Sequence, residues 1–174
     1  MKELIRLRHG LGDLQPGTRF AYTLFLVFCG AGYVVMTVLA VQRSGLSPGG
    51  IAVYYAGDEA TQRYGKTQGE MLEVTHFHLF AMPLLLFVQG HLFLLTRWPM
   101  RIKVALVLAG AFGIALDLAA PWLIVYVSHG LAALKDVARV LMAVAFTAFA
   151  VVPLWEMWGP RSRRGRVADE NSAA

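Results

Sequence analysis

The chain has 174 residues, of which 57% are hydrophobic and 16% are charged, and its formal net charge is +5. A soluble domain carries roughly a quarter charged residues, so this surplus of apolar residues is expected to face lipid. The only cysteine, Cys29, excludes intrachain disulfides and cysteine-based zinc sites. The nucleophile-elbow, phosphate-loop and HExxH motifs are absent, which disfavours hydrolases and nucleotide-driven transporters.

Four apolar runs follow one another along the chain, and each has roughly the 20 residues that a helix needs to cross the hydrocarbon core of a bilayer. We expect these spans at about 20–42, 74–95, 104–127 and 134–155. A basic N-terminal segment (1–19) precedes them, a long loop (43–73) follows the first, and a basic, flexible tail (158–174) ends the chain. The predicted fold class is therefore all-α, a four-helix transmembrane bundle that forms one membrane domain over 20–157.

The first loop, 43–73, is too long to be a tight connection between two spans. Pro48, Gly49 and Gly50 are helix breakers near its start. After these breakers we expect an amphipathic segment that lies on the outer membrane surface.

Basic residues predict the orientation of the bundle. Of the 16 Lys and Arg residues, eleven fall on one side of the membrane and five on the other. The eleven are Lys2, Arg6, Arg8, Arg19, Arg97, Arg101, Lys103, Arg161, Arg163, Arg164 and Arg166; the five are Arg43, Arg63, Lys66, Lys135 and Arg139. The positive-inside rule places both termini in the cytoplasm and the 43–73 loop in the periplasm, as in a multi-pass protein of a bacterial inner membrane. The net charge follows from this topology and does not indicate nucleic-acid binding.

Several polar residues lie within or at the ends of the spans, where each ionised group costs about 3 kcal/mol and usually faces the bundle interior. They are Glu73, Thr75, His76, His78, Gln89 and His91 in the second span, Asp117 and His129 at the third, and Lys135, Asp136, Arg139 and Glu156 in the fourth. Asp117 is the acid nearest mid-depth, and we expect it to act as a proton relay or as a structural acid.

The depth of each histidine follows from the helical rise of 1.5 Å per residue. His76, His78 and His129 share the outer end of the bundle, and His91 lies roughly 20 Å deeper than His78. His76 and His78 point about 200° apart on a helix, so one face cannot present both. On an ideal helix, His76 points in a direction closer to that of His91 than His78 does. A kink at Pro83 would change this relation, so the choice between His76 and His78 stays open.

Three interpretations follow from these residues. The first is a non-covalent b-type haem near the periplasmic face, bound by His129 and by His76 or His78, since imidazoles from facing helices are common haem ligands. Lys135 and Arg139 lie at the same level and would pair with its propionates. Small residues would leave space for the flat ring or allow close helix approach; they are Cys29 to Gly32, Gly110, Gly113 and Ala115.

In helix number and histidine depth, the chain resembles the small four-helix membrane b-type cytochromes. The spacing from His76 or His78 to His91 is similar to that between two haem ligands on one helix of di-haem cytochromes b. The resemblance implies a respiratory electron-transfer subunit with haem b, which exchanges electrons between quinone and a periplasmic partner. A second site would consist of His91, Gln89 and Glu156, although no second histidine lies at that depth.

The second interpretation is a copper, zinc or iron site at the outer surface, with His76, His78, His129 and Glu73 as ligands. The third is a cofactor-free accessory subunit of a larger membrane complex, in which buried charges serve only to neutralise one another. In that case Asp117 would pair with Arg139, and Glu156 with Arg97 or Arg101. A subunit of an oxidoreductase complex is thus favoured over a stand-alone enzyme.

Overall fold

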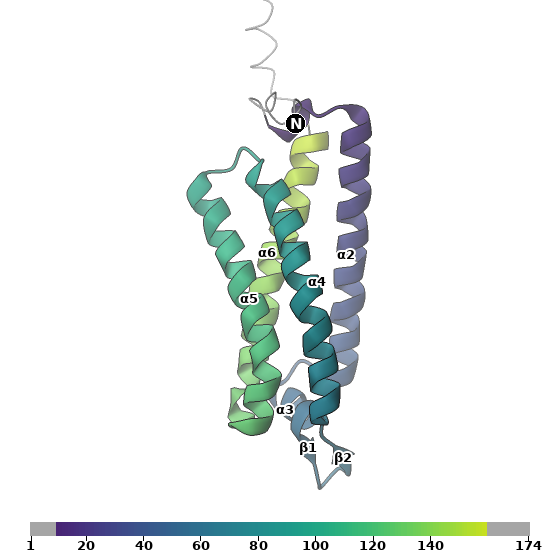
Figure 1. Cartoon of the computed structure of the whole chain (residues 1–174), viewed down its shortest axis with the longest axis vertical. Helices are drawn as coiled ribbons and strands as arrows, with labels where there is room; N and C mark the ends of the chain where they lie inside the picture. Colours follow the sequence, from purple (N-terminus) through teal and green to yellow (C-terminus); the bar gives the residue numbers. More distant parts are fainter. Residues whose placement is uncertain (1–9, 160–174) are drawn as a thin grey trace, which may run out of the picture.

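Residues 10–159 are described by the computed structural model, which is a long helical bundle (Figure 1). Its elements are η2 (Leu11–Asp13), α2 (Pro16–Ser44), α3 (Pro48–Ala56), β1 (Gly57–Asp58), β2 (Arg63–Tyr64), α4 (Gln68–Leu94), α5 (Met100–Tyr126), η3 (His129–Ala132) and α6 (Ala133–Trp158). The predicted tail and residues 1–9 lie outside the described residues.

Four helices, α2, α4, α5 and α6, are long and apolar enough to cross a membrane, which confirms the predicted four-helix transmembrane fold. They are longer than the expected spans: α4, for example, has 27 residues and begins at Gln68. A helix of that length measures about 40 Å, which is the thickness of a bilayer with its headgroups. The early start of α4 has a local cause, because Thr67 and Glu70 form a capping box at its N-terminus.

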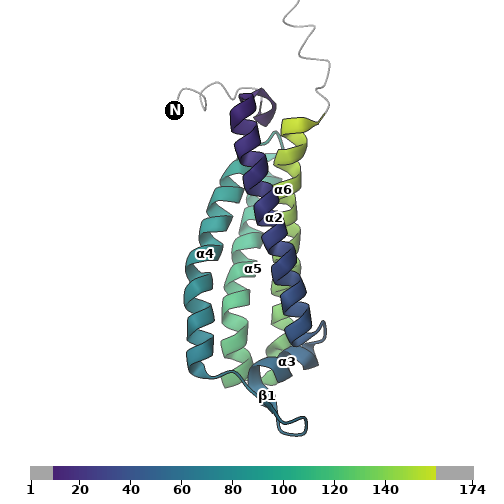
Figure 2. The ribbon, with the colours of Figure 1, turned by 90° about the vertical axis from the view of Figure 1, so that its right-hand side faces the viewer.

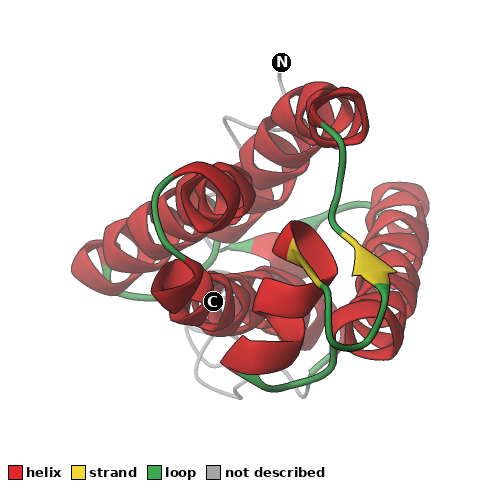
Figure 3. Ribbon diagram, turned by 90° about the horizontal axis from the view of Figure 1, so that it is seen from below, coloured by secondary structure: helices red, strands yellow, loops and turns green. Residues whose placement is uncertain are grey.

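The two ends of the bundle differ in structure. The start of α2, the α4–α5 connection and the end of α6 lie at one end, here called the terminal end (Figure 1). The α3 helix, the β1–β2 hairpin and η3 lie at the other, here called the cap end, and Figure 3 shows α3 and the hairpin lying across it. Both ends of the described chain therefore lie on the same side, as an even number of spans requires.

The long first loop is an ordered cap instead of an irregular connection. Pro48 is in the first turn of α3, and the Ser47 hydroxyl caps that helix by accepting a hydrogen bond from Gly50 N at 3.1 Å. Ile51 of α3 is fully buried against Ile124 of α5 and Ala132 of η3. The predicted helix breakers thus begin α3, and the buried side chain of Ile51 attaches this helix to the bundle.

The terminal end is closed by residues of the N-terminal segment that precede α2. Leu11 and Leu14 are buried, and they pack in one cluster with Leu26, Leu92 and Met157. These two leucines of the N-terminal segment therefore extend the hydrophobic core at the terminal end.

The tightest helix contact joins α5 to α6 at small residues. A Cβ built on Gly113 would lie 3.0 Å from Met142 Cγ and 3.1 Å from Leu141 Cβ, so a larger residue would require these neighbours to shift. By contrast, α2 packs against α6 and α3, and only 6% of its most apolar window is buried, compared with 33% for the helix ending at Trp158. Figure 2 shows α2 running diagonally along the outside of the bundle. The bundle is thus three packed helices with a peripheral fourth.

Candidate functional site

The histidines of α4 lie on different faces of the helix. His78 comes seven residues after buried Met71, and seven residues turn a helix by about 700°, so both point inward. His76 is turned about 140° from Met71 and is exposed, as is His91. The question that the sequence left open is thereby answered: His78 faces the bundle, whereas His76 and His91 face outward.

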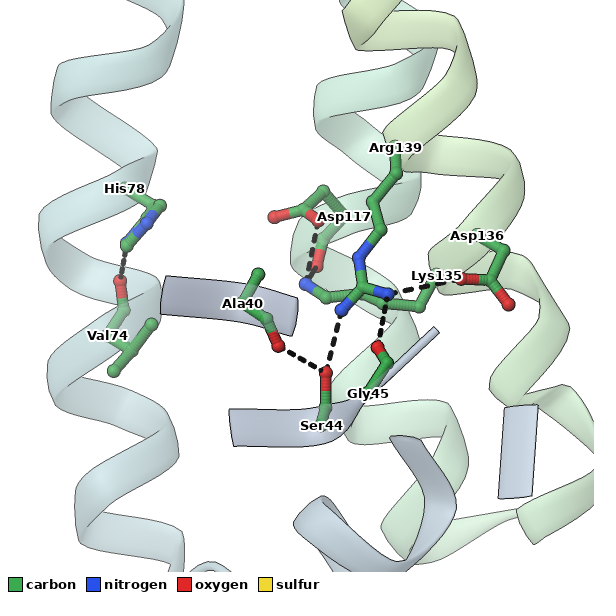
Figure 4. Close-up of polar contacts among 9 residues, drawn as sticks. All are labelled: Ala40, Ser44, Gly45, Val74, His78, Asp117, Lys135, Asp136 and Arg139. Carbon is green, nitrogen blue, oxygen red and sulfur yellow. Dashed lines mark hydrogen bonds and ion pairs between the residues drawn. The ribbon is translucent and has the colours of Figure 1, made fainter. Parts of the chain in front are cut away.

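The ring of His78 is held in one orientation by its own helix. Its Nδ1 lies 2.8 Å from the carbonyl oxygen of Val74, one turn earlier (Figure 4). A carbonyl oxygen can only accept a hydrogen bond, so Nδ1 carries the hydrogen. In the neutral ring, Nε2 then has a free lone pair, which can accept a hydrogen bond or bind a metal.

A buried ion pair joins α5 to α6 on the cap-end side of the bundle. Lys135 Nζ lies 2.7 Å from Asp117 Oδ1 and also donates to the Asp117 backbone carbonyl at 2.9 Å (Figure 4). That carbonyl would normally accept from the N–H of residue 121, but residue 121 is Pro and has none. Lys135 therefore replaces the missing helical donor while it neutralises the carboxylate.

A second ion pair, on α6, reaches the end of α2. Arg139 NH1 lies 3.1 Å from Asp136 Oδ1, and NH2 donates to Ser44 Oγ at 2.8 Å (Figure 4). Arg139 NH1 also lies 3.5 Å from the carbonyl oxygen of Gly45, just past the C-terminus of α2, where a positive charge is favoured. The four residues Asp117, Lys135, Asp136 and Arg139, here called the charged cluster, carry no net charge.

These contacts correct one expectation and bear on another. Asp117 pairs with Lys135 and not with Arg139, because Lys135 also satisfies the carbonyl freed by the proline. Both bases have carboxylate partners within the chain. The predicted pairing of Lys135 and Arg139 with haem propionates stays a prediction.

Tyr55 of α3 covers the charged cluster from the cap end. Lys135 Nζ lies 5.7 Å from the centroid of its ring, within the range of a cation–π contact. Burial raises the pKa of the Tyr55 hydroxyl, and the nearby Asp117 carboxylate raises it further. The phenol therefore stays neutral over the physiological range.

His78 and Asp117 lie in the same layer of the bundle. Trp122 Nε1 donates to Thr75 Oγ1 at 3.0 Å and so sets the register of α5 against α4. His78 lies three residues, or about 4.5 Å, beyond Thr75 from the cap end, and Asp117 lies five residues, or about 7.5 Å, beyond Trp122. Asp117 also faces inward, because it is seven residues from both Gly110 and Ile124, which are buried. An imidazole and a carboxylate thus share one level on neighbouring inward faces.

The residues predicted to share a metal site are spread apart. His129 begins η3 and is exposed, and Glu73 and His76 are exposed on α4. Within residues 10–159, no three side chains of His, Cys, Asp or Glu converge closely enough to hold a metal ion. Metal binding by His76, His78, His129 and Glu73 stays a prediction, and the structure does not bring these four side chains together.

The second predicted site is also not brought together. Gln89 of α4 is buried. His91 is exposed and stacks on Phe87 at 6.1 Å between ring centroids. Glu156 Oε1 accepts a hydrogen bond from the backbone N–H of Arg97 at 2.6 Å. The expected neutralisation of Glu156 by the charge of Arg97 or Arg101 stays a prediction.

Two basic residues counted only for topology have structural partners at the terminal end. Lys103 is buried, and its Nζ donates to the carbonyls of Leu94 at 2.6 Å and Thr96 at 2.8 Å, which closes the C-terminus of α4. Arg19 donates to the carbonyls of Gly12, Leu14 and Met157. In the sequence, Lys103 lies only nine residues after Leu94, and this short separation could have predicted that Lys103 binds the end of the preceding span.

Comparison with known proteins gives one match. A family model described as a transmembrane helical domain matches residues 45–164. This match begins directly after α2, so it covers the cap and the three packed helices and omits the peripheral one. No curated protein and no solved structure matches the chain.

Proposed function

The chain belongs to the Aq_1264_TM family of transmembrane helical domains, and we propose that it is a non-enzymatic subunit of a larger membrane assembly. In this proposal α3 to α6 form a rigid unit, and α2 contacts the partner. By the positive-inside rule the cap end faces the periplasm of a bacterial inner membrane and both termini face the cytoplasm.

The observation that supports this proposal best is the internal pairing of the charged cluster. Asp117 with Lys135 and Asp136 with Arg139 satisfy one another, and Arg139 also attaches the end of α2 through Ser44. Charges placed in a membrane are costly unless paired, and here the pairing joins three helices. Structural stabilisation therefore accounts for these residues without chemistry at a reacting atom.

The exposed α2 helix supports a contact with another membrane protein. A Cβ built on Gly30 or Gly32 meets no heavy atom within 4 Å, so these small residues are not used for packing inside the chain. Small residues in transmembrane helices permit close approach of a second helix. The family match that omits α2 is consistent with a helix that has its own role.

The test is native electrophoresis of the full-length protein extracted in a mild detergent. We expect wild type to migrate within a complex larger than the monomer, and the Gly30→Leu/Gly32→Leu double variant to lose it. A matched Val34→Leu/Val35→Leu variant, at exposed positions of the same helix, should keep it. A wild-type protein that migrates only as a monomer would contradict the proposal.

A second candidate is the electron-transfer subunit with one b-type haem. It is favoured by His78, which faces inward and whose Nδ1–H bond to Val74 leaves Nε2 available as the atom that would hold the haem. Bound haem would supply one-electron transfer between quinone and a periplasmic partner. His129 would have to provide the second ligand, and Lys135 and Arg139 would stay in their ion pairs.

An absorption spectrum of the purified protein tests this candidate. Reduced-minus-oxidised Soret and alpha bands are expected if haem is bound. They should disappear in His78→Ala and His129→Ala and persist in His76→Ala, whose ring faces outward. Copper, zinc or iron at about one per chain without haem bands would support the metal interpretation instead, and a colourless, metal-free protein would leave only the accessory role.

A further inference from the structure

We propose that the terminal end of the bundle binds the headgroups of anionic phospholipids, through Arg101 and the arginines that follow α6. The proposal holds whether or not the chain belongs to a larger complex, because it concerns the lipid next to this end. Topology accounts for the side on which these basic residues lie, and the proposal adds what they bind there. It follows from three features of the terminal end, namely its excess of positive charge, its exposed tryptophans and the position of its arginines.

The first feature is that the positive charge of the chain is concentrated at one end of the bundle. Counted with the chain segments that adjoin it, the terminal end has eleven Lys and Arg residues and five Asp and Glu residues, whereas the cap end with the charged cluster has five and six. The five acids are Glu3, Asp13, Glu156, Asp169 and Glu170; the six are Asp58, Glu59, Glu70, Glu73, Asp117 and Asp136. Excess positive charge attracts anions, so a partner of the terminal end is expected to be anionic.

The second feature is the position of tryptophans at this end. Trp155 and Trp158 lie in the last turn of α6 and are 69% and 58% exposed, and Trp98 is exposed in the α4–α5 connection. The Trp158 ring is held against α2, because its Nε1 donates to Thr23 Oγ1 at 2.8 Å. Exposed tryptophans of membrane helices lie at the level of the lipid headgroups. The positive charge of this end is therefore expected beside lipid phosphate groups, which favours lipid over a soluble acidic partner.

The third feature is that an arginine at this end is available to a ligand. Arg101 is exposed in the first turn of α5, and within residues 10–159 no acid forms an ion pair with it. By contrast, Arg19 and Lys103 donate to backbone carbonyls of the bundle. The backbone N–H of Arg97, in the same connection, donates to Glu156 near the end of α6 at 2.6 Å. The connection that leads to Arg101 therefore lies beside the end of α6.

The sequence after α6 adds four arginines within the six residues 161–166. The first, Arg161, follows Trp158 by three residues. Since a chain spans at most about 3.6 Å per residue, Arg161 is within roughly 11 Å of the end of α6. Basic clusters of this size directly beside a membrane helix bind anionic lipids. A guanidinium group also matches a phosphate group well, because it can donate two parallel hydrogen bonds.

The test is a titration of the full-length protein in a mild nonionic detergent with phosphatidylglycerol or phosphatidylcholine, in which native mass spectrometry gives the dissociation constant of each lipid. Wild type should bind phosphatidylglycerol more tightly. One basic residue near an anionic surface strengthens binding about fivefold, so Arg101→Gln and Arg161→Gln should each weaken phosphatidylglycerol binding about fivefold. The double variant should weaken it about 25-fold. Binding of phosphatidylcholine should stay unchanged in all three.

Arg43→Gln/Arg63→Gln is the matched control, because it removes two exposed basic residues from the cap end, and it should bind phosphatidylglycerol like wild type. Arg101→Lys keeps the charge and should lose less affinity than Arg101→Gln. Equal binding of the two lipids by wild type would overturn the proposal, and so would an equal loss in the cap-end control. Displacement of bound phosphatidylglycerol by poly-glutamate or oligothymidylate would also overturn it, because a soluble polyanion would then be the ligand.

Discussion

Lys135 Nζ lies 2.9 Å from the Asp117 backbone carbonyl, which Pro121 leaves without a helical N–H donor. The same ammonium group neutralises the Asp117 side chain at 2.7 Å. One lysine thus compensates both for a proline within a membrane helix and for a carboxylate beside it, and the charged cluster can be tested on this basis.

Removing the lysine should destabilise the bundle strongly. In Lys135→Met the Asp117 carboxylate stays in the membrane without its cation, which costs about 3 kcal/mol or more for a buried pair. Reversible unfolding in mixed micelles measures this loss. Asp117→Asn added to Lys135→Met should recover part of it. Lys66→Met, which breaks an exposed pair with Glu70, should leave the unfolding curve unchanged.

The proline and the lysine should be coupled energetically. In Pro121→Ala the backbone N–H of residue 121 can donate to the Asp117 carbonyl, so that carbonyl no longer depends on Lys135. Lys135→Met should then cost about 1 kcal/mol less in the Pro121→Ala background than in wild type. Four unfolding measurements give this double-mutant cycle. Strictly additive effects on the free energy of unfolding would show that Lys135 stabilises only the Asp117 carboxylate and not the Asp117 backbone carbonyl.

The two groups of glycines should respond oppositely to enlargement. Gly113→Ala places a methyl group 3.0 to 3.2 Å from Met142 and Leu141, and overpacking of this kind costs about 1–3 kcal/mol. Gly30→Ala meets open space on α2 and should be neutral or slightly stabilising. The free energies of unfolding of the two variants, measured under the same conditions, distinguish the cost of overpacking from the gain in helix propensity. Equal losses would contradict the peripheral position of α2.

Stability should fall at alkaline pH through Tyr55. Its pKa in the folded protein is raised above the unfolded value near 10, so above about pH 10 the unfolded chain loses this proton more readily than the folded one. The contribution of Tyr55 is thus fully present below pH 10 and declines as the pH rises. Unfolding of Tyr55→Phe between pH 8 and 11.5 should show a smaller decline than wild type. Tyr64→Phe, at a residue that is 97% exposed, serves as the control.

The orientation can be checked with single cysteines in a Cys29→Ser background. A membrane-impermeant maleimide added to intact bacterial cells should label Thr61→Cys, in the turn of the hairpin at the cap end. It should not label Pro99→Cys, in the α4–α5 connection at the terminal end. The reverse pattern would show that the excess of basic residues does not set the topology.

The sequence alone determined that four helices span a membrane and that both ends of the described chain, residues 10 and 159, lie on the same side. A span must cover about 30 Å of hydrocarbon and satisfy its backbone internally, so length and hydropathy suffice to find it.

Only the tertiary structure decided which polar residues meet. The inward position of His78 follows from the rotational phase of α4, which depends on its packing against α5 and α6. Asp117 pairs with Lys135 because the long lysine side chain from α6 also reaches the backbone carbonyl of Asp117, which Pro121 leaves without a helical donor. The close approach of α5 to α6 at Gly110 and Gly113 likewise appears only in the packed structure. Hydropathy is a property of each segment, whereas these contacts depend on distances between segments, and so they emerge only when the helices are packed.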